Sequence, residues 1–193
     1  MTNTTYYQEF TSPIGRLLLV SDGAALTGLS MSDNDGGPQP GPGWMRGGKL
    51  LESACEQLDA YFSGASYEFD IPLAADGTDF QKRVWRQLQR IPFGETISYG
   101  EQARRIGQPK ASRAVGRANG QNPIAIVVPC HRVIGADGTL TGFGGGIDRK
   151  KWLLDHEASA KRALMNAGDT IRRSRNSRRG PQPRRTTNAL SKK

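Results

Sequence analysis

The sequence predicts a mixed α/β fold of the α+β type, with a small N-terminal antiparallel sheet plus a helix, followed by a mainly helical C-terminal domain. Two observations predict this order. Strand-like alternation of apolar and polar residues is found mainly in the first 31 residues, whereas many apolar residues between positions 51 and 119 recur at helical spacing. The length of 193 residues suits one ordinary domain or two small ones, each with a real core.

The first segment is predicted to be a three-stranded meander. Residues 6–10 and 17–20 are strand-like and are joined by the turn Ser12-Pro13-Ile14-Gly15. Asp22-Gly23 then turns the chain into a third strand at 25–31. The next residues, 32–48, contain so many glycines and prolines that we expect a loop without regular structure.

A helix and a short extended piece complete the first domain. Gly64 is expected to end this helix, whose apolar residues recur at helical spacing: Leu51, Ala54, Leu58, Tyr61 and Phe62. Residues 67–73 are predicted to be extended. The polar, glycine-containing stretch 74–77 follows, and we place a domain boundary there.

The second domain is predicted to begin with a capped helix. Thr78 or Asp79 is the expected N-cap, and the helix ends before Pro92. One face of this helix is apolar through Phe80, Val84 and Leu88.

Two shorter helices follow and form a helix-turn-helix candidate. Ser98 is expected to cap the first of them, with Glu101 completing a capping box. The breaker Gly107-Gln108-Pro109 separates it from the second helix, residues 110–119. The sequence therefore predicts a winged-helix-like C-terminal domain.

The second of these helices is basic and otherwise small-sided. It carries Lys110, Arg113 and Arg117, with alanine, serine and glycine between them, so its backbone can approach another surface closely. One interpretation is a DNA-recognition helix. The alternative is a pair of core helices with an ordinary basic face.

The motif Pro129-Cys130-His131-Arg132-Val133 is the main chemical signal. It follows the apolar run 124–128, predicted to be a buried strand, and precedes the glycine cluster 142–146. A thiol is a strong nucleophile only as thiolate, and an adjacent imidazole can accept its proton. Cys130 is thus a candidate nucleophile, and the alternative is an inert buried cysteine.

Charge is concentrated at the C-terminus. Residues 158–193 hold eleven of the 27 Lys and Arg residues and a single acid, Asp169, whereas the rest of the chain is nearly neutral. Because such a composition offers little apolar surface to bury, we expect residues 160–193 to be disordered. This tail is either a solvated segment or a salt-sensitive arm that binds polyanions.

Composition also bears on the compartment. No apolar run approaches the roughly 20 residues of a membrane span, and no secretory signal is evident at the N-terminus. Two cysteines, Cys55 and Cys130, do not make a disulfide framework, which favours a reducing compartment. Adjacent Cys130 and His131 lack metal-ligand spacing, so we expect no metal site.

Four linked motifs resemble the signature of the O6-alkylguanine-DNA alkyltransferases. In order, they are Arg113-Ala114-Val115-Gly116, Asn122-Pro123, Pro129-Cys130-His131-Arg132-Val133 and Trp152-Leu153-Leu154-Asp155-His156-Glu157. The resemblance implies three parts: a ribonuclease H-like domain at 1–76, the DNA-binding and catalytic domain at 77–158, and a basic disordered tail at 159–193. It also implies repair of alkylated DNA by direct damage reversal.

The resemblance implies a role for each motif residue. Cys130 would take the alkyl group from O6 of guanine and keep it as a thioether, so each molecule would act once. His131 would draw off the thiol proton through a bound water, and Glu157 would hold the imidazole. Tyr99 would supply a proton to the departing guanine, and Asn122 would align the active-site loop.

The same resemblance implies which residues form the base pocket and that the reaction uses no cofactor. Backbone groups of Cys130, Val133 and Gly144 would read the purine edge, and Phe143, where many members have tyrosine, would wall the pocket. The glycine run 144–146 replaces a loop usually interrupted by serine or alanine. No cofactor is expected, and repair of O4-alkylthymine is left open.

The implied partner is double-stranded DNA that contains O6-alkylguanine, bound in the minor groove without strong sequence preference. Arg113 would enter the base stack in place of the flipped nucleotide. Further expected DNA contacts are Ser98, Lys110, Ser112, Ala114, Arg117 and Asn119. We expect a monomer, cytoplasmic in a prokaryote and nuclear in a eukaryote.

Three other functions are weighed against this one. An alkyltransferase-like protein that binds damage without chemistry is the main alternative, although Cys130 argues against it. A cysteine hydrolase would need an oxyanion hole, for which no motif is found. A fused regulatory repair protein would need clustered cysteines and about twice the length.

Overall fold

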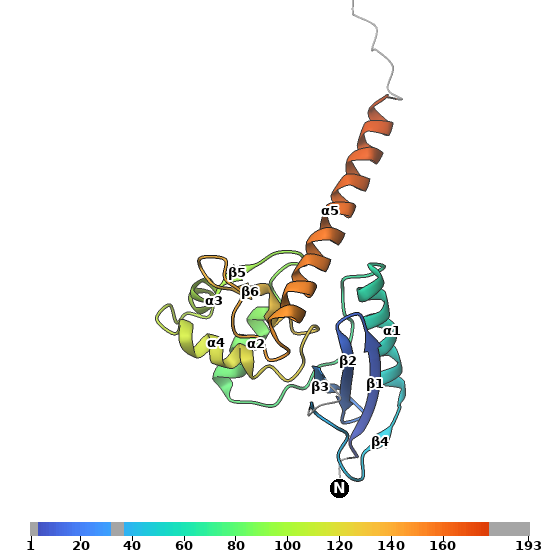
Figure 1. Cartoon of the computed structure of the whole chain (residues 1–193), viewed down its shortest axis with the longest axis vertical. Coiled ribbons are helices and arrows are strands. Elements are labelled where there is room, and N and C mark those ends of the chain that lie inside the picture. Colours follow the sequence, from blue (N-terminus) through green and yellow to red (C-terminus); the bar gives the residue numbers. More distant parts are fainter. Residues whose placement is uncertain (1–3, 32–36, 178–193) are drawn as a thin grey trace, which may run out of the picture.

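The sheet and the C-terminal helices form two lobes that lie side by side, and a long helix starts between them and extends away from both (Figure 1). The computed structural model describes residues 4–31 and 37–177, with the backbone alone for 167–177. The predicted division at residue 158 falls inside this long helix, α5 (Ile147–Ser177).

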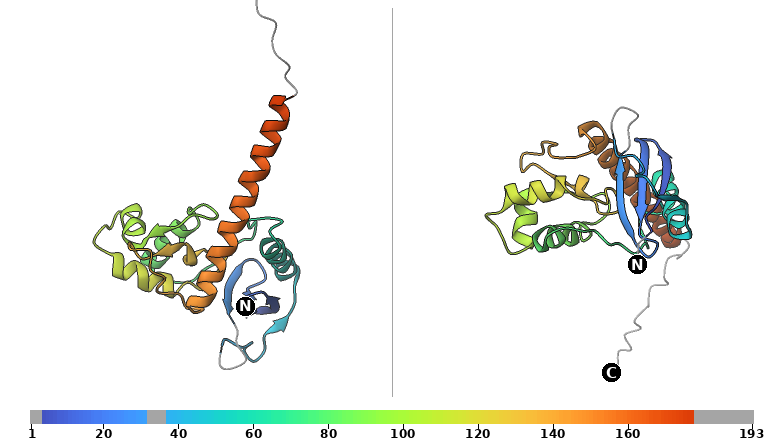
Figure 2. Two further views of the ribbon diagram at one scale, coloured as in Figure 1. Left: turned by 45° about the horizontal axis from the view of Figure 1, so that its top comes forward. Right: turned by 90° about the horizontal axis from the view of Figure 1, so that it is seen from below.

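The N-terminal lobe is a four-stranded sheet covered by one helix. The strand order is β3-β2-β1-β4, in which β1–β2 and β2–β3 are antiparallel and β4 is parallel to β1. The elements are β1 (Tyr6–Ser12), β2 (Gly15–Ser21), β3 (Leu26–Met31), β4 (Met45–Arg46) and α1 (Lys49–Ser63). The helix lies along one face of the sheet, as the right-hand view of Figure 2 shows, and buries its apolar residues there.

The predicted meander and helix are confirmed, with one correction. Gly64 ends α1 in the left-handed region (φ 77°), as its lack of a Cβ allows. Residues 32–48 are not wholly irregular, because Met45 and Arg46 pair with the edge of β1 as β4. Residues 67–73, predicted to be extended, form no helix, and Leu73 makes an isolated parallel bridge to Leu26 of β3.

The C-terminal lobe is built from three short helices, the start of a long one and a two-stranded parallel sheet. Its elements are α2 (Asp79–Leu88), β5 (Ile97–Ser98), α3 (Tyr99–Arg105), α4 (Ser112–Gly120), β6 (Val133–Ile134) and α5 (Ile147–Ser177). Thr78 is the N-cap of α2 and forms a reciprocal capping box with Gln81. Ser98 caps α3 through the backbone of Glu101. The predicted second half of that box is wrong, because the Glu101 carboxylate pairs with Arg104 and Arg105 instead.

The apolar run 124–128 is buried, but it is not the predicted strand. Ile124 makes one parallel bridge to Leu29 of β3, and the chain then turns tightly, with Ile126 at a positive φ of 71°. The backbone N–H of Val128 donates to the carbonyl of Ile124 over 2.9 Å. An uninterrupted apolar run predicts burial equally well for a strand and for a compact turn, so the pattern could not distinguish the two.

Helix α5 corrects the prediction that residues 160–193 are disordered. The helix continues to Ser177, and residues 178–193 lie outside the described part of the chain. The physical reason is that residues 160–167 are mostly strong helix formers, and a helix already nucleated by the fold extends without a new nucleation cost. A basic composition is therefore compatible with helix here.

The two lobes share backbone hydrogen bonds and apolar contacts. The N–H of Leu29 in β3 donates to the carbonyl of Pro123, and the N–H of Ala125 donates to the carbonyl of Leu29, over 2.8 and 2.9 Å. The segment that leads to Cys130 is thereby attached to the edge of the N-terminal sheet. Among the described residues, none of the helices combines the length and apolar character that a membrane crossing requires.

Candidate active site

Cys130 lies in a 3₁₀ turn, Cys130–Arg132, that follows the buried turn at 124–128. Its side chain is buried, with 6% of its surface exposed. The side-chain amide of Asn122 donates to Sγ over 3.3 Å and to the carbonyl of Val128 over 2.7 Å, so it ties the thiol to the turn before it. Burial raises the pKa of the thiol, while the Asn122 amide and the charge of Lys150 act in the opposite direction.

His131 and Glu157 form a buried pair. Nε2 of His131 lies 2.8 Å from Oε1 of Glu157, and neither side chain is exposed. Burial lowers the pKa of the imidazole, although the carboxylate opposes this change, so His131 is neutral near neutral pH. Among the described residues, Nδ1 of His131 is the buried side-chain polar atom that has no hydrogen-bond partner. A neutral imidazole with a free nitrogen can accept a proton.

Several donors surround the carboxylate of Glu157. Arg132 approaches both oxygens, with Nε 2.9 Å from Oε2 and Nη2 2.9 Å from Oε1. The N–H of Gly94 donates to Oε2 over 3.0 Å, and the Tyr61 hydroxyl donates to Oε1 over 2.9 Å. Burial alone would raise the pKa of this carboxyl, but His131 and Arg132 lower it to about 2. Glu157 is therefore an ionised acceptor in a fixed orientation.

Lys150 is a site residue that the sequence reasoning missed. It lies on the first turn of α5 and is fully buried, and its ammonium donates to the carbonyls of Val133 and Thr141 over 2.6 and 2.7 Å. It therefore holds both ends of the loop that leads to the glycine cluster. Lysine is rarely buried, and nothing in the sequence around Lys150 indicates that this one is. Its burial results from the tertiary fold.

Tyr99 faces the glycine loop across a shallow depression. Its hydroxyl donates to the carbonyl of Thr141 over 2.7 Å, and burial raises its pKa, so it stays protonated near neutral pH. A Cβ on Gly142, whose φ is 66°, would lie 2.9 Å from this hydroxyl, so only glycine allows the approach. The depression has a volume of about 320 Å³ and is lined by Tyr99, Ser112, Arg113, Gly116, Thr141 and Gly142.

The expected base-pocket residues lie beside the thiol or along the same loop. Val133 directly follows the 3₁₀ turn and is fully buried, and Phe143 is nearly buried. A Cβ on Gly144 would lie 3.6 Å from the carbonyl of Gly120, at the end of α4. The loop thus passes close to the helix that is expected to meet DNA.

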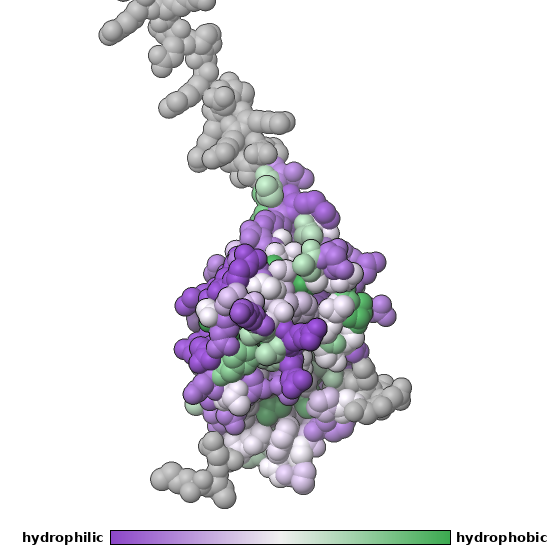
Figure 3. Space-filling view, turned by 90° about the vertical axis from the view of Figure 1, so that its left-hand side faces the viewer, coloured by the Kyte–Doolittle hydropathy of each residue, from purple (hydrophilic) through white to green (hydrophobic). Residues whose placement is uncertain are grey.

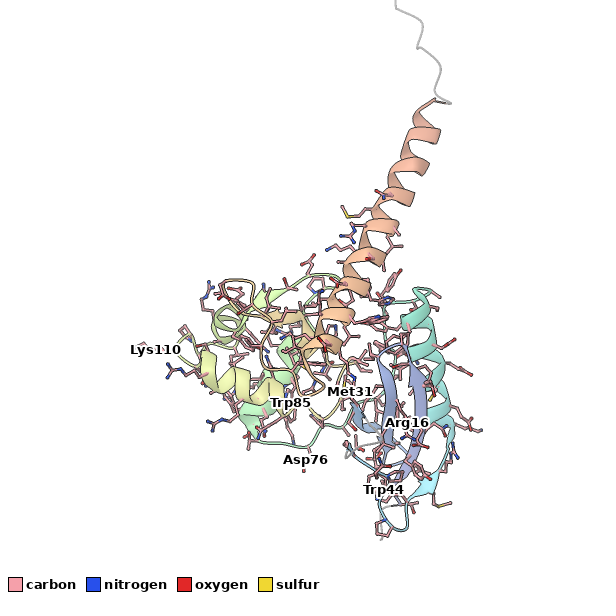
Figure 4. The ribbon with its side chains drawn as sticks, viewed as in Figure 1. Arg16, Met31, Trp44, Asp76, Trp85 and Lys110 are labelled. Atoms are coloured by element: carbon pink, nitrogen blue, oxygen red, sulfur yellow. The ribbon has the colours of Figure 1, made fainter. Side chains whose placement is uncertain are left out.

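The outer face of α4 is basic and small-sided, as expected. Arg113, Ala114 and Arg117 are exposed, and Ser112 is half-buried beside Tyr99. Lys110 lies at the outer tip of the lobe, far from the sheet (Figure 4). Seen from the side of α3 and α4, the surface is mostly hydrophilic, with scattered hydrophobic side chains (Figure 3). Ser98 is half-buried and is used as the cap of α3.

Asn119 does not lie on this face, so the expected DNA contact of its side chain is wrong. It is 2% exposed, and its amide exchanges hydrogen bonds with the amide of Gln102 over 2.8 and 3.3 Å. The physical reason is the helical period, which turns position 119 toward α3 while Arg113 and Arg117 face outward. Asn119 connects the two helices of the pair instead.

The other cysteine and the metal-binding residue types form no second site in the described part of the chain. Cys55 lies on α1, and burial raises the pKa of its thiol to about 11. Among residues 4–31 and 37–177, no three His, Cys, Asp or Glu side chains gather as metal ligands would.

Comparison with protein families matches nearly all of the described domains. Residues 79–159 match the DNA-binding domain of 6-O-methylguanine DNA methyltransferase, and residues 5–75 match the ribonuclease-like domain of the same family. Residues beyond 159, which include the outer part of α5, lie outside both matches.

Individual relatives agree with the family models. The methylated-DNA–protein-cysteine methyltransferase of Mycolicibacterium paratuberculosis is 57% identical over 163 residues, which cover 84% of this chain and 98% of the relative. Its counterpart from Methanosarcina acetivorans is 50% identical over 154 residues, covering 80% and 99% of the two chains.

Solved structures show the same similarity in three dimensions. The crystal structure of the Mycobacterium tuberculosis O6-methylguanine methyltransferase has a TM-score of 0.74 and 52% identity, and the match covers 81% of this chain and 94% of that one. The structure of the M. tuberculosis protein OGT in complex with DNA gives the same TM-score with 53% identity, over 80% and 94%. By both family models, by these relatives and by the shared fold, the chain belongs to the 6-O-methylguanine DNA methyltransferase family.

Proposed function

We propose that this protein repairs DNA by direct damage reversal, transferring the alkyl group of O6-alkylguanine irreversibly to Cys130, once per molecule. The observation that carries the proposal is the arrangement of the site: a buried thiol next to a neutral imidazole that an ionised carboxylate holds in place. The relatives named as methylated-DNA–protein-cysteine methyltransferases support the reaction class.

The thiol proton leaves through His131. Nε2 is engaged by Glu157, so the unpartnered Nδ1 is the nitrogen that can accept a proton. A water between Sγ and Nδ1 would satisfy that buried nitrogen and relay the proton, as the family resemblance implies. The imidazolium that forms is stabilised by Glu157, whose pKa of about 2 keeps it charged.

The bond changes balance without a cofactor. The sulfur electron pair of the Cys130 thiolate forms a bond to the alkyl carbon, and the bond from that carbon to O6 breaks. Its electrons remain on the guanine, which takes up a proton supplied by the Tyr99 hydroxyl. Tyr99 then regains a proton from solvent and the imidazolium releases one to solvent, so the protons balance. The products are normal guanine and S-alkylcysteine, a thioether that does not turn over.

DNA is the partner, and we propose that α4 is the helix that meets it. Its small residues let the backbone come near the minor groove, and Arg113 stands at the rim of the depression that Tyr99 and Gly142 line. We propose that Arg113 replaces the flipped nucleotide in the stack and that Lys110 and Arg117 contact phosphates. Such contacts carry little sequence information.

The proposal is tested by intact-protein mass after incubation with a duplex that holds one O6-methylguanine. The native chain should gain a single methylene and stop at one equivalent, Cys130→Ala should gain nothing, and the control Cys55→Ala should behave as the native chain. Tight binding of the damaged duplex without any mass gain would instead favour the non-catalytic, alkyltransferase-like function. A gain that persists in Cys130→Ala would assign the chemistry to another residue.

We also propose that the protein acts as a monomer, which light scattering on the free and the DNA-bound protein would check. A cytoplasmic location stays a prediction from the cysteine content, and cell fractionation would test it.

A further inference from the structure

Tyr61, on α1 of the N-terminal lobe, reaches the catalytic carboxylate. Its side chain is 1% exposed, and its hydroxyl donates to Oε1 of Glu157 over 2.9 Å, across 96 residues of sequence. This is the same oxygen that Nε2 of His131 contacts over 2.8 Å. A residue of the N-terminal lobe therefore shares the acceptor on which the imidazole depends.

The position of the Tyr61 hydroxyl is fixed from several sides. The backbone carbonyl of Tyr61 lies 2.9 Å from Nε2 of His156, the residue before Glu157 on α5. The ring packs edge-on against Phe93 and against the His156 ring. Both ends of Tyr61 thus contact consecutive residues of α5, and its hydroxyl has little freedom to leave Oε1.

We propose that Tyr61 is a positioning residue of the alkyl-transfer site, whose hydroxyl shares Oε1 of Glu157 with His131 and so limits how tightly the carboxylate holds the imidazolium. This inference rests on the proposed function. It makes the N-terminal lobe part of the proton-accepting network and not only a support for the fold.

The charged and titratable groups around His131 define what the hydroxyl does. Glu157 faces the imidazole from α5, Arg132 from the 3₁₀ turn, and Lys150 from the first turn of α5, while the Cys130 thiol is its neighbour in sequence. Glu157 is the only anion among these groups at neutral pH. Any donor that shares its Oε1 weakens its attraction for the imidazolium.

Removal of the hydroxyl should therefore make His131 a stronger base. Burial and the nearby carboxylate raise the pKa of Tyr61, so the hydroxyl is a donor at every working pH. In Tyr61→Phe, Oε1 keeps only the contacts from His131 and Arg132 and holds the imidazolium more strongly. Glu157 itself stays in place, because Arg132 and the Gly94 N–H still bind it.

The test compares Tyr61→Phe with Tyr67→Phe in the full chain. Tyr67 stacks on the ring of Phe93 at 4.0 Å between centroids, so the control removes a hydroxyl from the same aromatic cluster without touching Glu157. The single-turnover rate of methyl transfer from the damaged duplex is measured from about pH 5 to about pH 9, the range in which histidine titrates.

The expected result is a shift of the ascending limb of the pH profile. In Tyr61→Phe the apparent pKa of this ascending limb should rise by about half a unit. Transfer would then be about threefold slower at any pH below that pKa, and the rate on the plateau at higher pH would be unchanged. Tyr67→Phe should keep the native limb. An unshifted limb in Tyr61→Phe, or an equal loss of rate at every pH, would show that Tyr61 only packs and would overturn the inference.

An NMR titration of the His131 imidazole gives a second measurement that does not need the reaction. Its pKa should be higher in Tyr61→Phe than in the native chain and in Tyr67→Phe, and an unchanged value would also overturn the inference. The two proposals fail separately. A native chain that takes up no methyl group refutes the proposed function, whereas a native chain that reacts normally beside an unshifted variant refutes the role of Tyr61 alone.

Discussion

At the scale of single residues, the proposed mechanism activates the thiol of Cys130 through its neighbour His131, because the pKa of the thiol is raised and not lowered. Burial raises the pKa of the thiol and lowers the pKa of His131, so both groups are uncharged in the resting protein. Reaction then requires proton transfer between them. Such a thiol reacts slowly with unselective electrophiles, which suits a protein that can react only once.

Lys150 provides the first residue-scale prediction. In Lys150→Met, the Cys130 thiol loses a nearby positive charge and the buried carbonyl of Val133 loses its ammonium donor, while the carbonyl of Thr141 keeps the Tyr99 hydroxyl. A rise of about one unit in the thiol pKa would slow methyl transfer about tenfold at neutral pH, with recovery at alkaline pH. Transfer rate against pH measures this effect.

The matched control is Lys151→Met, because Lys151 is the exposed neighbour on the same helix. It should keep the native profile. If Lys150→Met were slower by the same factor at every pH, Lys150 would act through loop position alone and not through the thiol.

At the scale of elements, α4 carries Arg113 at the rim of the depression that Tyr99 and Gly142 line. Small residues surround Arg113, so the helix can approach a groove while the guanidinium reaches further. If Arg113 acts in base flipping alone, its removal should slow repair of a duplex but not the alkyl transfer step itself.

Arg113→Ala should slow repair of a duplex about 10-fold to 100-fold, because the vacated position in the stack loses about 1 to 3 kcal/mol of stabilisation. Transfer from the free base O6-benzylguanine, which needs no flipping, should stay within about twofold of native. Single-turnover assays on both substrates measure the two rates. Equal losses on both would place Arg113 in the chemistry instead.

The outer part of α5 is the second element with a testable role. Residues 167–193 are strongly basic and follow the last described side chain, Asn166. If this segment binds phosphates, its deletion should make the slope of log affinity against log salt less negative, by about 0.9 for each phosphate that is no longer neutralised. A same-length variant with glutamine for each arginine and lysine of the segment should behave like the deletion, and an unchanged slope in both would leave the segment a solvated tail.

At the scale of the whole molecule, the N-terminal lobe touches the active site at several points. Tyr61 reaches Glu157, and Arg149 of α5 donates to the carbonyls of Ile14 and Gly145, over 2.7 and 3.1 Å. A Cβ on Gly145 would lie 2.8 Å from the sulfur of Met31, at the end of β3. Figure 4 shows Met31 where the sheet meets the helical lobe. Residues of both lobes thus contact the glycine cluster 142–146.

Acid sensitivity is the prediction at this scale. The folded pKa of Glu157 is about 2 against an ordinary 4.5, so the folded state resists its protonation. The resulting stabilisation, about 3 kcal/mol, is complete above pH 4.5 and is lost as the pH falls toward 2. The lowered pKa of His131 acts in the same direction. Below pH 6.5 the unfolded chain binds a proton at this imidazole more readily than the folded chain does, so the free energy of unfolding falls with the pH.

Urea unfolding midpoints measured across this pH range provide the check. Glu157→Gln should be less stable than the native chain at neutral pH, and the two curves should converge in acid. Curves that stay parallel down to the lowest pH would show that Glu157 does not carry the acid sensitivity.

The sequence by itself determined the local elements and the chemical residue types. Strand alternation, the caps Thr78 and Ser98, and the stop at Gly64 depend on neighbours a few positions away, so pattern alone located them. The adjacent Cys130 and His131 were likewise readable along the chain, and the linked motifs indicated the family.

Only the tertiary structure decided what depends on distant contacts. It showed the apolar run 124–128 to be a turn, continued α5 through a segment predicted to be disordered, and turned Asn119 inward. It also brought Lys150 and Tyr61 into the site, with Tyr61 lying 96 residues from its partner Glu157. The physical reason is that burial and hydrogen-bond partners are set by the packing of the whole chain, and a local pattern does not contain them.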